Sequence, residues 1–238
     1  MADSNTVVPV SSAKRAGGKK TGKTLVDKKR ERAYEPGDLR RALVEEGRRM
    51  FEENGATELS LRALARRLGV SEAAPSRHFR GKEELLAAIA SSGFRELAAQ
   101  RGLISAQQLP ALPKAREMML SYVRFAITHA GLFDLMIGPR ILEEFRHGEL
   151  KETGEGSYAY FSRAITDLAR ESGWPKRTFE YFSHAAWSME HGIAALILAG
   201  RIPRENSTLK MPKIIEFSID FFLDGIVAGP GRSNDARS

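Results

Sequence analysis

Apolar side chains recur at helical spacing along most of this 238-residue chain. Leu39, Leu43 and Phe51, for example, are separated by multiples of four residues, which places them on one face of a helix. No stretch alternates apolar and polar residues with the period of two that a half-buried strand requires. The sequence therefore predicts an all-α fold. The expected helices span residues 38–54, 60–68, 71–79, 82–97, 113–130, 132–147, 157–172, 176–200 and 211–227.

Composition narrows the classes of protein further. There is no cysteine, which excludes disulfides, thiolate zinc sites and cysteine nucleophiles. The apolar stretches at 193–199 and 214–227 are too short or too interrupted by charge to span a bilayer, and the N-terminus lacks the apolar core of a signal peptide. We therefore expect a cytoplasmic protein that binds no membrane, no metal and no cofactor.

The formal net charge of +7 is concentrated near the N-terminus. Residues 1–36 hold nine Lys and Arg against four Asp and Glu, in a tract rich in Gly, Ser and Thr that can bury little apolar surface. We expect a disordered basic arm over 1–36 and a disordered tail over 229–238. Residues 17–24 match the phosphate-loop pattern, but no buried strand delivers them and no sheet follows. A basic arm, with or without nonspecific affinity for DNA, is the preferred interpretation.

Residues 60–82 combine two short helices with a second cluster of positive charge. Ser60 can cap the first helix, Ala65 is small enough for a close helix crossing, and Gly69 tolerates the positive φ that a tight turn requires. This pattern is typical of a helix-turn-helix, which places its second helix in the DNA major groove, although an ordinary pair of packed helices has the same core. The basic side chains favour the DNA interpretation. They are Arg62, Arg66, Arg67, Arg77, Arg80 and Lys82, against Glu72 alone.

Residues 38–90 resemble the TetR family of transcriptional regulators. The motifs that carry the resemblance are Phe51 with Gly55, Ser60-Leu61, Leu64-Ala65, Leu68-Gly69-Val70-Ser71, His78-Phe79 and Lys82 before Leu85-Leu86. The segment from Trp187 to Gly192 is similar, more weakly, to the family's group with a Trp-x-x-x-His-Gly signature. The resemblance implies a helix-turn-helix domain at 37–84, a helical ligand-binding and dimerisation domain at 85–228, a homodimer, and repression that a small molecule relieves.

The resemblance also assigns the DNA contacts by position. It implies that Arg62 reaches a base or phosphate, that Arg77 lies on the groove-facing surface, and that Lys82 contacts the DNA backbone. An Arg can pair bidentately with guanine, and a Lys serves phosphate as a point charge. The full set of expected DNA-binding residues is Arg62, Ser71, Glu72, Ala73, Ala74, Ser76, Arg77, His78 and Lys82.

Two positions depart from the usual family pattern. Ser76 stands where the family often has a Tyr that grips a phosphate, and Ser keeps the hydroxyl without the reach. Pro75 removes a helical N–H and disfavours α geometry at the preceding residue. The DNA-reading helix is therefore expected to begin with a short or irregular turn.

The last two expected helices favour a dimer, which would suit double-stranded DNA with a palindromic operator. Small side chains on 176–200 form one stripe that permits close helix approach. The final helix is apolar along two lines, so it needs two burial partners, and burial within a single domain is the alternative to a second subunit. One of these lines consists of Ile214, Phe217 and Phe221. The residues assigned to the dimer interface are the small stripe and the other line: Ala185, Ser188, Gly192, Ala195, Ala199, Ile215, Ile219, Phe222 and Ile226.

Aromatic and methionine side chains of the C-terminal half could line a cavity for an apolar small-molecule effector. The same residue types more often form plain core, so the family resemblance is what favours a cavity here. Trp187 and His191, one turn apart, could equally be a packing motif. The expected ligand-binding residues are Met118, Tyr122, Phe125, His129, Phe133, Met136, Trp187 and His191.

Two other classes of protein compete with a ligand-controlled repressor. A ligand-independent architectural DNA-binding protein would need only the basic surface, whereas residues 101–238 carry seventeen basic and sixteen acidic side chains. An all-α enzyme would need a catalytic constellation, and neither His147 nor the acidic pairs of this half have the neighbours that known motifs require. Those acidic pairs are Glu143 with Glu144 and Glu149 with Glu152.

Overall fold

The structure is a computed structural model that describes residues 37–55, 58–141, 148–202 and 210–231. Of the two compact units of the chain, Met1–Arg30 lies wholly outside the described residues, so the following account concerns the second, Glu31–Ser238. The predicted basic arm with its loop motif at 17–24, the residues Glu143, Glu144 and His147, and the tail beyond residue 231 also lie outside the described residues.

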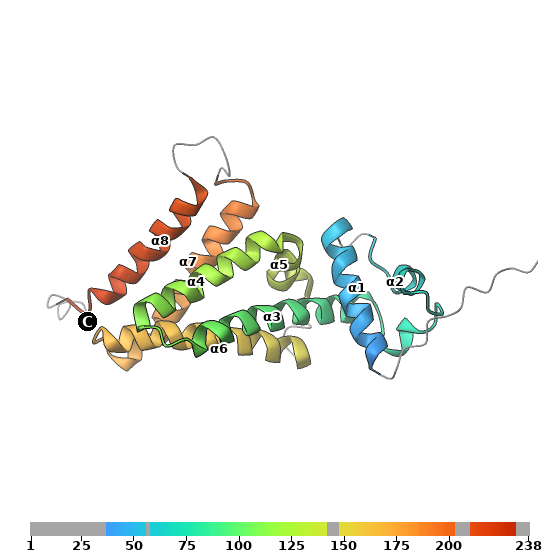
Figure 1. The fold of residues 1–238 in the computed structure, drawn as a ribbon, viewed down its shortest axis with the longest axis horizontal. Helices are drawn as coiled ribbons and strands as arrows, with labels where there is room; N and C mark the ends of the chain where they lie inside the picture. The colour runs from blue at the N-terminus through green and yellow to red at the C-terminus, as the bar shows by residue number, and fades with distance from the viewer. Residues whose placement is uncertain (1–36, 56–57, 142–147, 203–209, 232–238) are drawn as a thin grey trace, which may run out of the picture. The chain divides into compact units, whose positions relative to one another are not determined.

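The described residues form eight α-helices and no strand, which confirms the predicted all-α class (Figure 1). Three short 3-10 turns join them at η1 (Pro75–Arg77), η2 (Pro139–Ile141) and η4 (Lys176–Thr178). The helices are α1 (Asp38–Asn54), α2 (Leu61–Leu68), α3 (Lys82–Ala106), α4 (Ala111–Thr128), α5 (Ala130–Ile137), α6 (Gly148–Glu171), α7 (Phe179–Leu198) and α8 (Met211–Val227).

Local capping explains where the first two helices begin and end. The Ser60 hydroxyl accepts a hydrogen bond from the Ala63 N–H at 3.1 Å, and Gly69 ends α2 in the left-handed region at φ 69°, both as predicted. The start of α1 differs from the prediction, because Gly37 and not Asp38 occupies the N-cap position. Asp38 lies in the first turn, where its carboxylate accepts a hydrogen bond from Arg41 at 3.0 Å.

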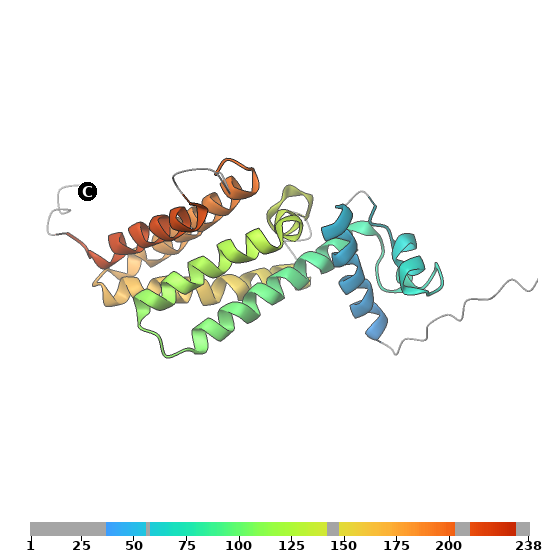
Figure 2. The same cartoon turned by 45° about the horizontal axis from the view of Figure 1, so that its top comes forward.

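The long helix α3 connects the packing of the N-terminal helices with that of the rest of the chain. It contacts α1, α4, α5 and α6, and Figures 1 and 2 both show it running alongside α6. The predicted domain boundary between residues 84 and 85 therefore lies inside a continuous helix.

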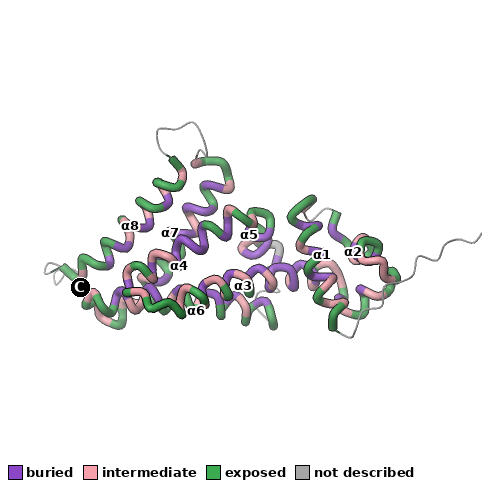
Figure 3. The backbone as a smooth tube through the Cα atoms, in the orientation of Figure 1, coloured by how far each residue is buried: buried purple, intermediate pink, exposed green. Residues whose placement is uncertain are grey.

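Buried apolar residues gather in two clusters, which Figure 3 shows as purple segments along the facing sides of the helices. The first cluster is built mainly from α1, α2, α3 and α5, with Leu64 and Phe79 almost completely buried. The second is built from α4, α6, α7 and α8, with Phe161 and Leu223 at its centre. Within the described residues, no helix combines the length and apolarity needed to cross a bilayer.

Two helix boundaries differ from the predicted ones for identifiable reasons. The helix expected at 132–147 ends at Ile137, because Gly138 is extended ahead of Pro139, and a proline disfavours α geometry at the residue before it. The helix expected at 157–172 begins at Gly148. Its first turns carry few large apolar residues and bury only Leu150 and the small Gly154, so apolar periodicity did not indicate them.

Gly93 marks the closest approach of α3 to α5, and its replacement tests this packing. A Cβ at Gly93 would overlap Met136 Sδ and lie 3.1 Å from Leu132 Cδ2. We expect Gly93→Ala to lower the free energy of unfolding by about 1–3 kcal/mol, because a packed core has no room for the added methyl. Urea denaturation monitored by circular dichroism measures this change.

Gly156→Ala on the exposed side of α6 is the matched control, because its Cβ would meet no described atom within 4 Å. Alanine is the better helix former, so this variant should be as stable as the original chain or more stable. Equal stabilities for the two variants would contradict a tight α3–α5 contact.

Candidate nucleic-acid interface and ligand cavity

Between α2 and α3 the chain forms one short helical turn, which backbone hydrogen bonds and two buried side chains hold in place. Ala74 N–H donates to the Ser71 backbone oxygen, and the His78 and Phe79 N–H groups both donate to the Pro75 oxygen. Pro75 and Phe79 are buried, and Phe79 belongs to the first core cluster, which fixes the end of the turn to it.

The predicted helix over 71–79 is therefore wrong in length, because only Pro75–Arg77 forms a helical turn, with Ala74 rather than Ser71 at its N-cap. The expected irregularity at Pro75 is present, and a proline at the first helical position fits its missing N–H.

Most of the predicted DNA-binding side chains lie on the exposed side of this segment. The exposed residues are Arg62, Ser71, Glu72, Ala73, Ser76 and Arg77, and the partly buried ones are Ala74, His78 and Lys82. The segment can therefore present a small, polar and basic surface to a partner molecule.

An ion-pair cluster covers part of that basic surface. Arg62 Nε donates to Glu72 Oε2 at 2.8 Å, and Arg66 Nη2 donates to Glu72 Oε1 at 3.4 Å. The hydrogen bond from Arg62 holds the pKa of Glu72 below its usual range, so this carboxylate stays ionised at neutral pH. Glu72 thus neutralises the charge of one of two neighbouring arginines, and its pairing with Arg66 could not be predicted from the sequence.

The other basic residues of this stretch have different roles. Arg67 pairs with Glu46 and Glu53, so it fastens α2 to α1 instead of presenting its charge outward. Arg80 pairs with Glu84 at 3.2 Å. All five arginines of this stretch are exposed, but Arg62, Arg66, Arg67 and Arg80 each share their charge with an acidic side chain, so the net positive charge of the cluster is smaller than its composition implies.

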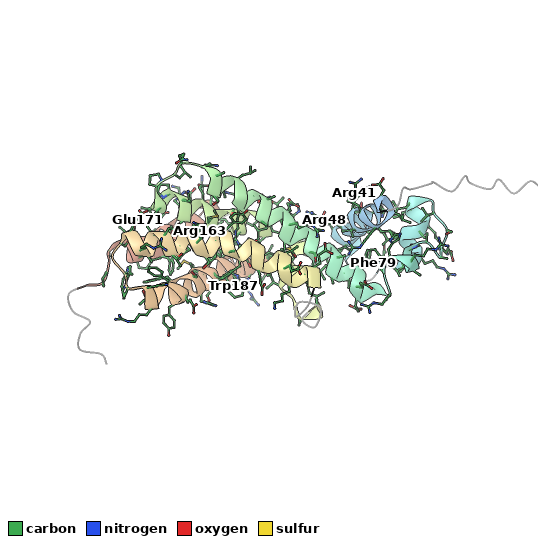
Figure 4. The ribbon with its side chains drawn as sticks, turned by 90° about the horizontal axis from the view of Figure 1, so that it is seen from below. Arg41, Arg48, Phe79, Arg163, Glu171 and Trp187 are labelled. Carbon is green, nitrogen blue, oxygen red and sulfur yellow. The ribbon has the colours of Figure 1, made fainter. Side chains whose placement is uncertain are left out.

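His129 lies where α4 passes into α5, in a polar cluster with α1 and α3, and not in a ligand cavity as predicted. Its Nε2 is 3.2 Å from Glu96 Oε1, and its Nδ1 is 3.3 Å from Glu52 Oε1. Arg48, which Figure 4 shows where α1 meets α3, pairs with Glu96 at 2.6 Å and with Glu52 at 3.2 Å. This cluster joins the helix that supports the exposed turn to the helices of the C-terminal half.

A cavity of about 380 Å³ lies among α3, α5, α6 and α7. Of the predicted ligand-binding residues, Tyr122, Met136 and Trp187 line it, and Figure 4 shows Trp187 on α7. Residues that the sequence did not single out complete its wall: Phe94, Leu97, Arg101, Ile137, Gly138, Ile141, Gly154, Glu155, Ser157, Tyr158 and His184.

The remaining predicted ligand residues divide into two groups. Phe133 and His191 line a second pocket beside the first, where the Tyr122 hydroxyl is 3.1 Å from His191 Nδ1. Burial raises the pKa of Tyr122 and lowers that of His191, so both are uncharged at neutral pH. Met118 and Phe125 are core residues that line neither pocket, so their assignment to the ligand site is wrong.

A buried ion pair lies at the wall of the cavity. Arg101 Nη2 donates to Glu190 Oε1 at 3.0 Å, and Arg101 Nη1 donates to the Ser157 carbonyl at 3.2 Å. The two charged side chains are 3% and 0% exposed. Burial raises the pKa of Glu190, and the Arg101 guanidinium opposes that rise. The sequence does contain a signal for this buried charge: Arg101 follows Phe94 and Leu97 at helical spacing, so it lies on an apolar stripe of its helix.

Comparison with known proteins places these features in one family. The N-terminal domain profile described as bacterial regulatory proteins, tetR family, matches residues 43–89, and a tetracyclin repressor-like C-terminal domain profile matches residues 115–219. Comparison with curated proteins gives no match for this sequence.

Among solved structures, a protein with unknown function from Rhodococcus sp. RHA1 is 30% identical with a TM-score of 0.68, covering 82% of this chain and 98% of that one. A transcriptional regulator of the TetR/AcrR family from Thermobifida fusca YX-ER1 is 18% identical with a TM-score of 0.58, covering 79% and 98%. The fatty acid degradation regulator FadR from Bacillus halodurans shares the fold at 9% identity, with a TM-score of 0.61 and coverage of 80% and 97%.

The chain belongs to the TetR family. It is therefore a DNA-binding regulator of this family, and the exposed turn at 71–78 lies within the matched N-terminal domain. The finer resemblance to the Trp-x-x-x-His-Gly group stays a prediction.

TetR-family regulators typically act as dimers, and the structure corrects which line of α8 is available to a partner. Ile215, Ile219 and Ile226 are buried in the chain's own second core cluster, and Phe222 packs against it. The assignment of the three isoleucines to a dimer interface is wrong, because the two apolar lines of a helix look alike in sequence and tertiary packing decides which one faces the core. Phe222 is only partly buried, so its place at an interface stays a prediction.

The other apolar line of α8 is exposed. The rings of Phe217 and Phe221 are 71% and 70% exposed and stack on each other with centroids 6.1 Å apart. On α7, the small residues of the predicted stripe lie at the surface. Ala185, Ser188, Ala195 and Ala199 are exposed and Gly192 is partly buried.

Replacing Glu72 tests whether its ion pairs restrain the basic surface of this TetR-family protein. We expect Glu72→Gln to raise affinity for duplex DNA of any sequence several-fold, because Arg62 and Arg66 lose their shared carboxylate. The slope of log affinity against log salt should steepen by about 1–2. Fluorescence anisotropy with labelled duplexes at several salt concentrations measures both.

Glu171→Gln makes the same change of net charge at the end of α6 (Figure 4) and serves as the control. Identical behaviour of the two variants would show that only net charge matters and that Glu72 has no specific restraining role.

Proposed function

We propose that this protein is a sequence-specific transcriptional repressor that binds a palindromic operator as a homodimer and is released by an apolar small molecule. The observation that carries the proposal is the exposed turn at 71–78, anchored by buried Pro75 and Phe79 and flanked by exposed Arg62 and Arg77. To read base edges in the major groove, a protein needs an exposed segment with basic side chains that the packed helices hold in place.

The chemistry of the exposed side chains suits separate tasks on DNA. Arg77 can donate two hydrogen bonds to a guanine edge, and the Ala73 methyl can contact a thymine methyl. Lys82, at the start of α3, can bind a backbone phosphate and position the turn without reading sequence. A single short turn reaches few bases, so specificity calls for a second copy on an adjacent major groove.

The exposed faces of α7 and α8 supply the surface for that second copy. The two exposed phenylalanines on α8 are costly to leave in water. The neighbouring stripe of small residues on α7 permits the close approach of another helix. In a two-fold dimer, the surface formed by these two faces would pack against the same surface of the second copy.

The position of the cavity supports control by a ligand. Phe94, Leu97 and Arg101 of α3 line it, and the same helix begins directly after the exposed turn. The Arg48–Glu52–Glu96–His129 cluster gives a second connection from the C-terminal half to α1. A ligand that fits one arrangement of these helices better than another would shift the protein toward or away from its DNA-binding form.

Selection of bound fragments from random duplex DNA tests the proposed function. We expect an inverted repeat, whose half-sites each match one copy of the turn. Arg77→Ala should relax preference at one half-site position, at a cost of about 1–3 kcal/mol on the selected sequence. Lys82→Ala should weaken all sequences alike and reduce the salt slope by about 1.

Recovery of fragments without a consensus would point to an architectural DNA-binding protein. Equal losses for both variants on selected and random DNA would overturn the assignment of these two roles.

The dimer surface makes a separate prediction. We expect Phe217→Asp combined with Phe221→Asp to yield monomers in sedimentation at micromolar concentration, because two buried charges would replace apolar contact area. The fold should persist, since both rings are exposed within one chain. Leu103→Asp, at an exposed position of α3, is the control and should leave the association unchanged. A monomeric parent protein, or a doubly substituted dimer, would contradict this interface.

A further inference from the structure

The cavity is apolar over most of its wall, yet one side holds buried polar atoms without partners. Four buried side-chain atoms have no hydrogen-bond partner among the described residues: Tyr158 Oη and a group of three around the Arg101 guanidinium, namely Arg101 Nε, Ser157 Oγ and Glu190 Oε2. Each unpaired polar atom in such a site opposes folding, because the hydrogen bonds that it loses with water are not replaced. Arg101 and Ser157 line the cavity, and Glu190 lies behind them, bound to Arg101, so a molecule inside the cavity would reach these atoms after a small movement of the side chains.

The three open positions define a hydrogen-bonding pattern. Arg101 Nε–H is a donor, Glu190 Oε2 accepts when the carboxyl group is ionised and can donate when burial keeps it protonated, and the Ser157 hydroxyl can act as either. They remain open because Glu190 engages only Nη2 of the guanidinium, at 3.0 Å, instead of pairing with both Nε and Nη2. The complementary ligand group therefore both donates and accepts.

Packing holds this polar group in place. The Arg101 guanidinium lies over the rings of Tyr122 and Phe161, 5.4 and 5.0 Å from their centroids, and its Nη1 is bound to the Ser157 carbonyl. A fixed guanidinium loses little further freedom when a ligand binds, which favours recognition of a defined group.

We propose that the cavity binds an uncharged, mainly apolar molecule whose single hydroxyl or amide group bridges Arg101, Ser157 and Glu190. This proposal rests on the proposed role of the C-terminal half as a ligand sensor. The apolar body of the ligand lies against Phe94, Leu97 and Trp187. A volume of about 380 Å³ is at the small end of the range for small-molecule pockets, so the ligand has a single short chain or a small ring system.

The charges of the site disfavour the other ligand classes. A carboxylate would place a second negative charge beside Glu190 around one buried guanidinium, unless Glu190 first took up a proton. An amine would compete with Arg101 for Glu190 and leave two cations in an apolar site. A pure hydrocarbon would fill the volume but leave all three polar atoms unpaired.

Titration calorimetry of the full-length protein with matched probes tests this inference. The first series is n-decanol, decanamide, n-decane and decanoate, and the second is β-naphthol, naphthalene and β-naphthoate. At neutral pH we expect the alcohol or amide of at least one series to bind about tenfold or more tightly than the matching hydrocarbon and the matching carboxylate, as one or two buried hydrogen bonds imply.

Three variants test whether the preference for the alcohol over the hydrocarbon depends on Ser157, Arg101 and Glu190. Ser157→Ala should weaken the binding of the alcohol several-fold and leave the hydrocarbon unchanged. The double variant Arg101→Met with Glu190→Met replaces the ion pair by apolar side chains, an exchange that buried pairs often tolerate, and should abolish the preference for alcohol over hydrocarbon. Ser218→Ala on α8, at a partly buried position outside the cavity lining, is the control for Ser157→Ala.

Each contrary result has a definite meaning. A carboxylate that binds as tightly as its alcohol at neutral pH would overturn the uncharged class. A preference that survives in the double variant would overturn the assignment to Arg101 and Glu190. If no probe of either series binds, the polar atoms are satisfied without an organic ligand and the proposal fails.

Adding the bound probe to the complex with the selected operator separates this inference from the proposed function. Tight binding of the alcohol with no release of DNA would contradict the repressor mechanism while keeping the site. Failure of all probes to bind, with an inverted repeat still selected, would remove the site while keeping the DNA-binding regulator.

Discussion

The packing of α3 is the constraint on which the rest of the structure depends. This one helix begins directly after the exposed turn, packs against α1 through Ile89 and against α5 at Gly93, and reaches the cavity with Phe94, Leu97 and Arg101. A continuous helix transmits a shift at one end to the other because its backbone hydrogen bonds resist bending. The turn proposed to face DNA and the cavity are therefore connected by one helix, and the proposed control by a ligand would need no separate connecting element.

Ion pairs serve opposite purposes at the two ends of this unit. Glu72 lies at the surface, where it balances Arg62 and Arg66 and can be exchanged for phosphate at little cost. Arg101 and Glu190 are buried, where removal of either partner would strand a charge in an apolar environment. In the proposed function, the surface pairs tune affinity for DNA, whereas the buried pair determines which ligand the cavity accepts.

Features fixed by neighbouring residues could be predicted from the sequence. Ser60 caps the start of α2, Gly69 ends it because glycine tolerates a positive φ, and Pro75 indicates an irregular turn. Features fixed by distant contacts could not. Arg101 and Glu190 are 89 positions apart, so nothing local indicates their pairing, and the two apolar lines of α8 are distinguished only by the core that buries one of them. For the same reason, the sequence could not show that His129 lies in the cluster with Arg48, and His129 was instead predicted to contact a small-molecule ligand.

Hydrogen exchange of the full-length protein with and without the selected operator duplex shows which residues the DNA covers. We expect slower amide exchange across residues 60–82 and the first turn of α3 when DNA is bound, with the exposed faces of α4 and α6 unchanged. Unaltered exchange at 60–82, together with protection elsewhere on the chain, would contradict the assignment of this turn as the DNA-reading element.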